Sequence, residues 1–372
     1  MDRREWMRRG SALGALSLLG TTGVISTLTA AEKAKFNPRD LEFPLQLQFN
    51  ENPFGPSAKV REAMVKAFDI GCRYPDPYSR ELLNMIAEKE GVSRDHIVIT
   101  GGSSEGLRIT GLTFANNGGE IIAARPTFLA MMTYAQQWGA SVNWVDLDDQ
   151  LTHNVDEMYK RISSKTKLIF LCNPNNPTST LLSKEKLVNF CTEASKKTIV
   201  FSDEAYYDFV EEKDYPSMVS LVKEGKDVIV SRTFSKVYGL AGLRIGYLIA
   251  KPALAKKIRD NVVAYTNVLA LKAAVSAMKD DEFYRFSLEK VKECKQIMYA
   301  AMDELKLEYI KSNTNFIFFK TGRNINTFNK QMLDEGVRVG RAFPPYNDWC
   351  RISTGTIEEV QYFAEKLKKV LS

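Results

Sequence analysis

Short runs of apolar and β-branched residues recur between residues 97 and 250, and stretches with a helical pattern separate most of them. Each run has the length of a buried strand and ends at polar or turn-forming residues. The runs are IVITG (97–101), EIIAA (120–124), VNWVDL (142–147), LIFLC (168–172), TIVFSD (198–203), VIVSRT (228–233) and IGYLIA (245–250). This pattern predicts a seven-stranded sheet.

The segment between the fourth and fifth runs illustrates the helical pattern. Ser183 is suited to cap a helix N-terminus, and Glu185 in the first turn complements the helix dipole. Apolar residues then recur every three or four positions, as in Leu187, Phe190, Cys191 and Ala194. Alternation of strands and helices predicts an α/β fold, with a mainly parallel sheet covered by helices on both faces.

The C-terminal third has a different pattern and predicts a smaller α+β domain. Residues 265–306 are helical in pattern, a hairpin-like set follows at 315–320, 337–340 and 350–354, and a last helix spans 357–370. We therefore expect a large domain at 72–265 and a small domain at 266–372. Residues 32–71 are predicted to pack on the small domain.

The first 31 residues are interpreted as a targeting segment rather than as part of the fold. Residues 2–8 read DRREWMR, and residues 11–30 are weakly apolar and rich in Gly, Ser, Thr, Ala and Leu. With Arg3 and Arg4 as the pair, the segment resembles a twin-arginine export signal, with cleavage after Ala31. This predicts a periplasmic protein. The alternative is a membrane anchor retained by an uncleaved signal, although the stretch is rich in Gly and Thr for a spanning helix.

Composition excludes several classes of function. Hydrophobic residues make up 44% and charged residues 26% of the 372 positions, as in ordinary folded proteins. The net charge of +6 is spread among interleaved acids and bases, so no nucleic-acid surface is predicted. Five cysteines without a CxxC pair and two isolated histidines predict neither a disulfide framework nor a metal site.

Polar residues gather where the predicted strands end. Asp203 closes one strand, residues 233–236 follow another, residues 101–104 follow the first, and NPNNPT follows Cys172. Ligands of such sheets bind at the carboxyl ends of the strands. We therefore expect the binding site at this rim.

Three motifs at this rim resemble those of the fold-type I, class I/II aminotransferases, with the closest likeness to the histidinol-phosphate aminotransferase branch. They are SRTFSKVYGLAGLRIGY (231–247), SDEAYYDF (202–209) and CNPNNPTS (172–179), and the resemblance extends over residues 47–370. It implies a pyridoxal 5′-phosphate (PLP) cofactor carried as a Schiff base by Lys236. Asp203 would keep the pyridine nitrogen protonated, which makes the ring an electron sink. Lys236, Asp203 and Tyr206 are the implied catalytic residues.

The resemblance also implies which other residues hold the cofactor. Tyr206 and Asn176 match the residues on the ring hydroxyl, although NPNNPT is also a good turn sequence. Phe128 matches the ring stacked on the pyridine, or is simply part of the core. Tyr74 matches a tyrosine that reaches the phosphate of the neighbouring subunit, which implies a homodimer. The phosphate group would be held at a helix N-terminus by Ser103, Ser104, Thr233, Ser235 and Arg244.

The substrate contacts follow the same resemblance. Arg351 matches the arginine that binds the α-carboxylate, a task suited to a guanidinium. Asn52 and Phe54 lie in the segment that covers the site. Gly340 stands where the histidinol-phosphate branch has a phosphate-binding arginine, with Arg338 and Arg341 displaced to either side, and Arg341 is kept as a substrate contact.

The run GRAFPPYNDWC (340–350) contains the aromatic residues Phe343, Tyr346 and Trp349. These residues could line an apolar pocket for a bulky amine. The run could equally be a proline-rich turn with its own packing.

The implied activity is transamination between an amino acid or related amine and a 2-oxo acid, both small molecules. A decarboxylase, racemase or lyase that uses the same cofactor is an alternative, and a non-catalytic PLP- or amine-binding protein is another. Arg351 favours a reaction that retains the carboxylate. A mere binder would not need Lys236, Asp203, Tyr206 and Arg244 together.

Overall fold

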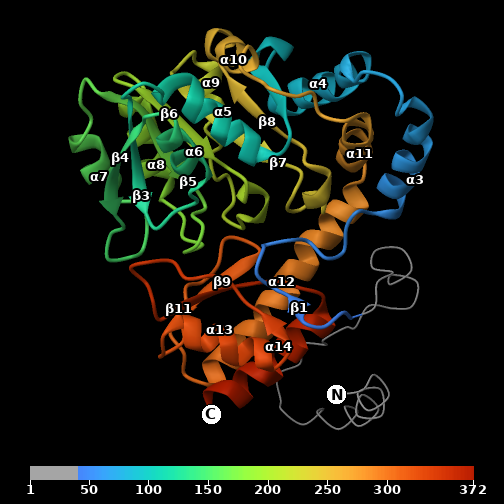
Figure 1. Ribbon diagram of the computed structural model, residues 1–372, viewed down its shortest axis with the longest axis vertical. Coiled ribbons are helices and arrows are strands. Elements are labelled where there is room, and N and C mark those ends of the chain that lie inside the picture. The colour runs from blue at the N-terminus through green and yellow to red at the C-terminus, as the bar shows by residue number, and fades with distance from the viewer. Residues whose placement is uncertain (1–40) are drawn as a thin grey trace.

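The computed structural model describes residues 41–372, which form a larger layered unit and a smaller unit joined by the long helix α12 (Figure 1). The predicted export signal lies outside the described residues. Among residues 41–372, no helix combines the length and the apolar character needed to cross a bilayer.

The larger unit is built on the predicted seven-stranded sheet. Its strand order is β2-β8-β7-β6-β5-β3-β4, and only β8 runs antiparallel to its neighbours. All seven apolar runs are confirmed as strands and the sheet as mainly parallel. The strands are β2 (Ile97–Thr100), β3 (Glu120–Arg125), β4 (Ser141–Asp146), β5 (Thr166–Cys172), β6 (Ile199–Asp203), β7 (Val228–Thr233) and β8 (Gly246–Ala250).

Helices cover both faces of this sheet because its central strands are apolar on both sides. Alternate residues of β5 face opposite layers: Phe170 packs into one apolar cluster and Ile169 into the other. One face is covered by α5 (Ser103–Ala115), α6 (Ala130–Gln137) and α10 (Pro252–Arg259). The other is covered by α4 (Asp76–Glu90), α7 (Val155–Lys160), α8 (Lys184–Ala194), α9 (Val219–Lys223) and α11 (Val268–Met278).

Local signals set the limits of these helices, and the predicted cap at Ser183 is confirmed. Ser183 caps α8 by accepting a hydrogen bond from the backbone N–H of Lys186. Gly91 ends α4 in the left-handed conformation, with φ of 64°.

The smaller unit surrounds its own apolar core. The antiparallel strands β9 (Phe316–Lys320) and β11 (Trp349–Ser353) pack with the C-terminal half of α12 (Asp281–Glu304) and with α13 (Ile325–Asp334) and α14 (Ile357–Leu371). The predicted hairpin-like set is only partly correct. Strand β10 (Val337–Arg338) pairs in parallel with β1 (Leu45–Gln46) instead of joining β9 and β11.

The apolar cores do not separate at the predicted boundaries, residues 71 and 265. Leu45 and Leu47 do pack in the smaller unit, as expected of residues 32–71. However, α3 (Ala58–Ala67) packs on α11, and its residue Val60 joins the core of the larger unit. Helix α11 belongs to the same core because almost its whole surface is apolar and buried.

Candidate active site

A cleft of about 650 Å³ opens where the carboxyl ends of the strands face the smaller unit. The larger unit contributes residues that follow β2, β3, β5, β6 and β7, and the smaller unit contributes Arg341, Phe343 and Arg351. This volume suits a small-molecule ligand. The rim predicted from the sequence is therefore where the cleft lies.

Lys236 lies in the loop after β7 and lines the cleft. Its Nζ donates hydrogen bonds to the backbone oxygens of Asn50 (2.9 Å) and Phe49 (3.2 Å). Burial lowers its pKa to about 8, and the guanidinium of Arg351 acts in the same direction. A substantial fraction of this amine is therefore neutral near physiological pH, as a nucleophile or proton carrier requires.

Asp203 ends β6 at the floor of the cleft, where it is 2% exposed. Burial raises the pKa of its carboxyl group to about 7. Its Oδ1 has no hydrogen-bond partner among the described residues. A buried carboxylate with an unsatisfied oxygen is suited to a cationic N–H donor, because pairing would offset its desolvation.

Tyr206 links the two units through side-chain hydrogen bonds. Its hydroxyl oxygen accepts from Nδ2 of Asn50 (2.9 Å) and from Nδ2 of Asn176 (3.4 Å). Asn176 in turn accepts from Nη1 of Arg351 (2.7 Å), whose Nη2 donates to the backbone oxygen of Gln48 (2.5 Å). A continuous network thus joins Arg351 to the segment that contacts Lys236.

The start of α5 has the features of an anion site. Ser103 and Ser104 are the first residues of this helix, and both line the cleft. The guanidinium of Arg244 lies against Gly102, so closely that a Cβ at Gly102 would collide with Nη2. Free backbone N–H groups and a cation at a helix N-terminus favour a phosphate group.

The structure brings most of the predicted residues together at the cleft. Besides those described above, Ser235 and Phe128 line it. Thr233 does not line it, and its hydroxyl donates a hydrogen bond to Oγ of Ser235 (3.0 Å).

Asn52 and Phe54 were expected as substrate contacts, and the structure places both elsewhere. Asn52 donates to the backbone oxygen of Val237 (2.8 Å), and Phe54 packs edge-on against Phe286. Both are buried, and neither lines the cleft.

Tyr74 is 82% exposed and does not reach the cleft of its own chain.

Asn50 contacts both Tyr206 and Lys236, and the sequence did not single it out. It lies in the same NENPFGP segment as Asn52. Asparagine at either position fits the same turn pattern, so the sequence carried no signal that distinguished them.

Of the aromatic residues in GRAFPPYNDWC, only Phe343 lines the cleft. Trp349 stacks on Phe318 at 4.9 Å between ring centroids, and Tyr346 packs against both rings. The apolar pocket and the packed turn were alternatives, and the contacts favour the packed turn.

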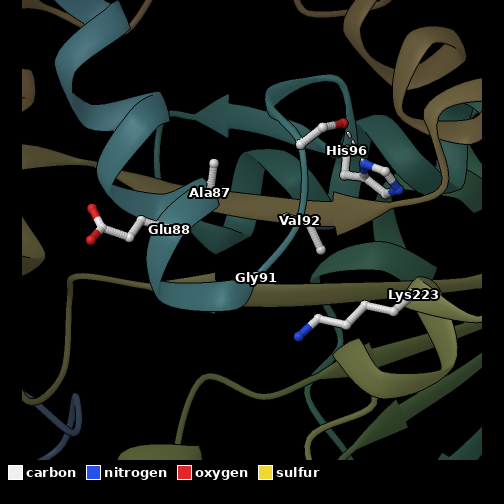
Figure 2. A pocket seen from close by; sticks show the side chains of 7 residues that line it. Ala87, Glu88, Gly91, Val92, His96 and Lys223 are labelled. Atoms are coloured by element: carbon white, nitrogen blue, oxygen red, sulfur yellow. Dashed lines mark hydrogen bonds between the residues drawn. The ribbon is translucent and has the colours of Figure 1, made fainter.

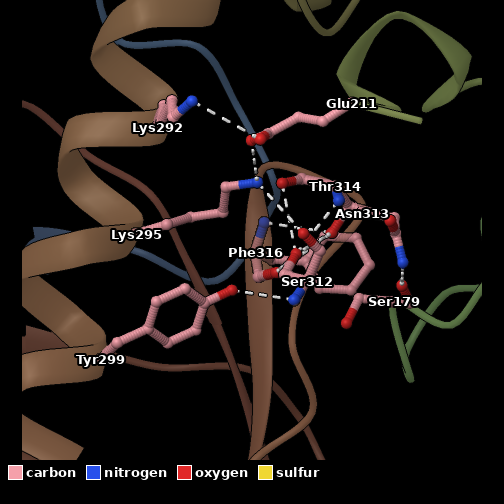
Figure 3. Close-up of polar contacts among 9 residues, drawn as sticks. All are labelled: Ser179, Glu211, Lys292, Lys295, Tyr299, Ser312, Asn313, Thr314 and Phe316. Atoms are coloured by element: carbon pink, nitrogen blue, oxygen red, sulfur yellow. Dashed lines mark hydrogen bonds and ion pairs between the residues drawn. The ribbon is translucent and has the colours of Figure 1, made fainter. Parts of the chain in front are cut away.

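Ion pairs and hydrogen bonds join the smaller unit to the larger one (Figure 3). Lys292 and Lys295 of α12 approach Glu211 at 3.6 and 3.5 Å. Asn313 donates to the backbone oxygen of Ser179 (3.2 Å), three residues after Asn176. These contacts connect α12 and the segment before β9 to the larger unit.

A second hollow lies at the C-terminal end of α4 (Figure 2). It is lined by Gly91, Ser93, His96 and Lys223, and Ser93 hydrogen-bonds to His96 (2.9 Å). The ammonium of Lys223 lies close to Gly91, where a cation stabilises the last carbonyls of the helix. This arrangement is explained by helix capping. Within residues 41–372, no cluster of metal-ligating side chains is present.

Comparisons with known proteins agree with this geometry. The family described as aminotransferase class I and II matches residues 44–367. A histidinol-phosphate aminotransferase of Halalkalibacterium halodurans is 37% identical over 86% of this chain and 87% of its own length.

Two solved structures are also similar. One, from Erwinia carotovora atroseptica and provisionally named histidinol-phosphate aminotransferase, has a TM-score of 0.85 and 30% identity over 88% of this chain and 95% of its own. The other is the histidinol-phosphate aminotransferase of Sinorhizobium meliloti in complex with pyridoxal-5′-phosphate. It has a TM-score of 0.82 and 23% identity, and covers 96% of this chain and 99% of its own.

Proposed function

Since this chain belongs to the class I and II aminotransferases, we propose that it moves the amino group of an amino acid with a second anionic group to a 2-oxo acid. Its cofactor is PLP, which supplies an aldehyde to bind the amine and a ring to accept electrons from the substrate α-carbon. The residues of the cleft fit this group. The observation that carries the assignment is the convergence of Lys236, Asp203 and the Arg244 anion site on one cleft.

Lys236 moves the proton in this reaction. With a pKa of about 8, its amine can be neutral when it takes a proton from the substrate α-carbon and can then return that proton to a neighbouring atom. The carbonyl of Asn50 gives the amine a hydrogen-bond acceptor beside the cleft. Asp203 would accept the hydrogen bond of the ring nitrogen through its free oxygen and keep that nitrogen protonated.

Arg351 would bind the α-carboxylate of the substrate. It is 9% exposed, and its Nε has no partner among the described residues. Burial lowers the pKa of Arg351 to about 10, so a carboxylate that pairs with it also relieves the cost of its burial. Retention of the carboxylate favours transamination over decarboxylation.

Arg341 supports a second anion on the substrate. It lines the same cleft, and its guanidinium lies 4.3 Å from the ring centroid of Phe343. Its hydrogen bond in the structure is to the neighbouring carbonyl of Ala342 (2.8 Å), and burial lowers its pKa with no acidic side chain to offset the effect. A substrate carboxylate or phosphate would supply that missing charge.

Position 340, directly before Arg341, has no room for a side chain. A Cβ there would collide with the backbone oxygen of Arg351. The cation for a distal anion must therefore come from position 341, which presents it differently from an arginine at position 340.

A donor panel tests the proposal. The PLP-loaded enzyme is mixed with single amino acids without an acceptor, and the 2-oxo acid formed per active site is measured. We expect about one equivalent, fastest with donors that carry a distal carboxylate or phosphate, and Arg341→Gln should remove that preference. Carbon dioxide release, or no oxo acid from any donor, would contradict transamination.

We further propose a homodimer that shares its sites. Exposed apolar side chains support it: Phe68, Tyr74, Val263 and Tyr265 are each at least 65% exposed. Such residues are costly to leave in water and are typical of an interface. Light scattering would show twice the chain mass, and mixed dimers of Tyr74→Phe and Lys236→Ala chains would reveal whether Tyr74 serves the partner's site.

We also propose export, supported by Arg3, Arg4 and the weakly apolar residues 11–30. Replacing both arginines with lysine should retain the enzyme in the cytoplasm. Fractionation of cells that express either form tests this, and equal distribution of the two would refute it.

A further inference from the structure

Asn50 occupies a central position between the catalytic side chains and the smaller unit. It is 1% exposed and uses all of its polar groups. Its Nδ2 donates to the hydroxyl of Tyr206 (2.9 Å), and its backbone oxygen accepts from Nζ of Lys236 (2.9 Å) and from Nδ2 of Asn315 (3.0 Å). Its backbone N–H donates to Oγ of Ser353 (2.8 Å).

The backbone of Asn50 is left-handed, with φ of 56°. Among residues other than glycine, asparagine is one of those that adopt this conformation most readily. The conformation lets the backbone oxygen contact Lys236 while the side chain contacts Tyr206. Asn50 therefore provides both the acceptor for Lys236 and the donor to Tyr206.

Ser353 determines which way the amide of Asn50 is oriented. Its Oγ accepts from the N–H of Asn50, so its single hydroxyl proton is free to donate to Oδ1 of Asn50 (3.0 Å). In the structure, Oδ1 of Asn50 therefore pairs with Ser353 and its Nδ2 pairs with Tyr206.

The hydroxyl oxygen of Tyr206 accepts from two amide groups, those of Asn50 and Asn176, so its own proton is not used by either. Tyr206 lines the cleft, and its proton can therefore be donated to a group bound there. Burial raises the pKa of Tyr206, which keeps this proton in place.

We propose that Asn50 is a positioning residue for transamination. It directs the proton of Tyr206 into the cleft and provides the acceptor for the Lys236 amine when that amine is not bonded to the cofactor. The proposal rests on the proposed function. Asn315 and Ser353, both buried in the smaller unit, hold Asn50 in place.

The variant Asn50→Asp tests this because it keeps the size and the backbone preference of the side chain. A carboxylate cannot donate, so Tyr206 would have to donate its proton to residue 50, and the new negative charge would favour protonated Lys236. We expect kcat to fall at least ~10-fold, with KM for the donor within about threefold. The pKa of the Lys236 amine in the cofactor-free protein should rise by about one unit.

The amine pKa is measured from the pH dependence of its modification by an acylating reagent, followed by peptide mass spectrometry. This readout needs neither PLP nor activity, so it separates failure of this inference from failure of the assigned reaction. Asn50→Gly, which keeps the backbone oxygen, should lower kcat and leave the amine pKa near that of the wild type.

Asn52→Asp is the matched control, since Asn52 is also buried and donates to a backbone oxygen but touches neither Lys236 nor Tyr206. It should lower stability without changing the amine pKa. An Asn50→Asp protein with the wild-type amine pKa and wild-type kcat would overturn the proposal, and so would equal pKa changes in Asn50→Asp and Asn52→Asp.

Discussion

The buried ion pair between Glu204 and Arg232 is expected to stabilise the sheet next to the cleft, and its contribution to the free energy of unfolding can be measured. Glu204 directly follows β6 and Arg232 lies on the neighbouring strand β7, just before the loops of the cleft, with 2.9 Å between Oε2 and Nη2. Their side chains are 3% and 9% exposed. Glu204 also accepts from the backbone N–H of Met218 (2.8 Å) and from the hydroxyl of Ser217 (2.8 Å).

Both charges of this pair are close together and buried, so the loss of one of them is costly. Two unit charges at this distance attract by about 6 kcal/mol at an effective dielectric constant of ~20, and the cost of removing both charges from water offsets most of that gain. Removing Arg232 alone keeps the cost for Glu204 and loses the attraction. We therefore expect Arg232→Met to lower the free energy of unfolding by about 3–5 kcal/mol.

The double variant Glu204→Gln, Arg232→Met removes both charges and should recover much of that loss. Urea unfolding of the cofactor-free proteins, followed by circular dichroism, measures both differences. An Arg232→Met protein within about 1 kcal/mol of wild type would show that the pair contributes no more than an exposed ion pair. The pair would also not be stabilising if the double variant lost more unfolding free energy than Glu204→Gln and Arg232→Met lose together as single variants.

Three further predictions concern the cleft. Because burial lowers the pKa of Lys236 to about 8, incorporation of PLP into the cofactor-free protein should accelerate as pH rises through 8, as the amine loses its proton. Stopped-flow absorbance measures this rate, and a midpoint near the ordinary lysine value of 10.5 would contradict it. Asp203→Asn should retain PLP but lower kcat at least ~100-fold, since the ring nitrogen loses its anionic partner. Steady-state kinetics in excess PLP test this, and activity within tenfold of wild type would count against the role. Gly340→Ala should cost about 1–3 kcal/mol of stability and raise KM for the donor, because the new Cβ displaces the backbone of Arg351. Gly242→Ala is the stability control, because its Cβ would meet no atom within 4 Å, and equal unfolding midpoints for the two variants would refute the prediction.

The sequence predicted the larger unit well because its strands are buried on both faces. Continuous apolar runs such as 168–172 leave little ambiguity, and polar residues at their ends marked the rim of the site. The sequence could not predict the pairing of β1 with β10, since strands of two residues carry no periodicity.

Residues 50–56, NENPFGP, show where sequence patterns fail within the site. Asn50 and Asn52 are alike as residue types, and only the left-handed backbone at Asn50 distinguishes the one that contacts Lys236. Gly340 is similar: its close approach to Arg351 is a tertiary contact that local sequence does not encode.

Reductive trapping tests the central assignment most directly. The PLP-loaded protein is treated with borohydride, digested, and analysed by peptide mass spectrometry. We predict one stable cofactor adduct per chain, located on Lys236, and loss of the near-visible absorption band in Lys236→Ala. An adduct on another lysine, or no adduct in a protein that retains its fold, would contradict the assignment.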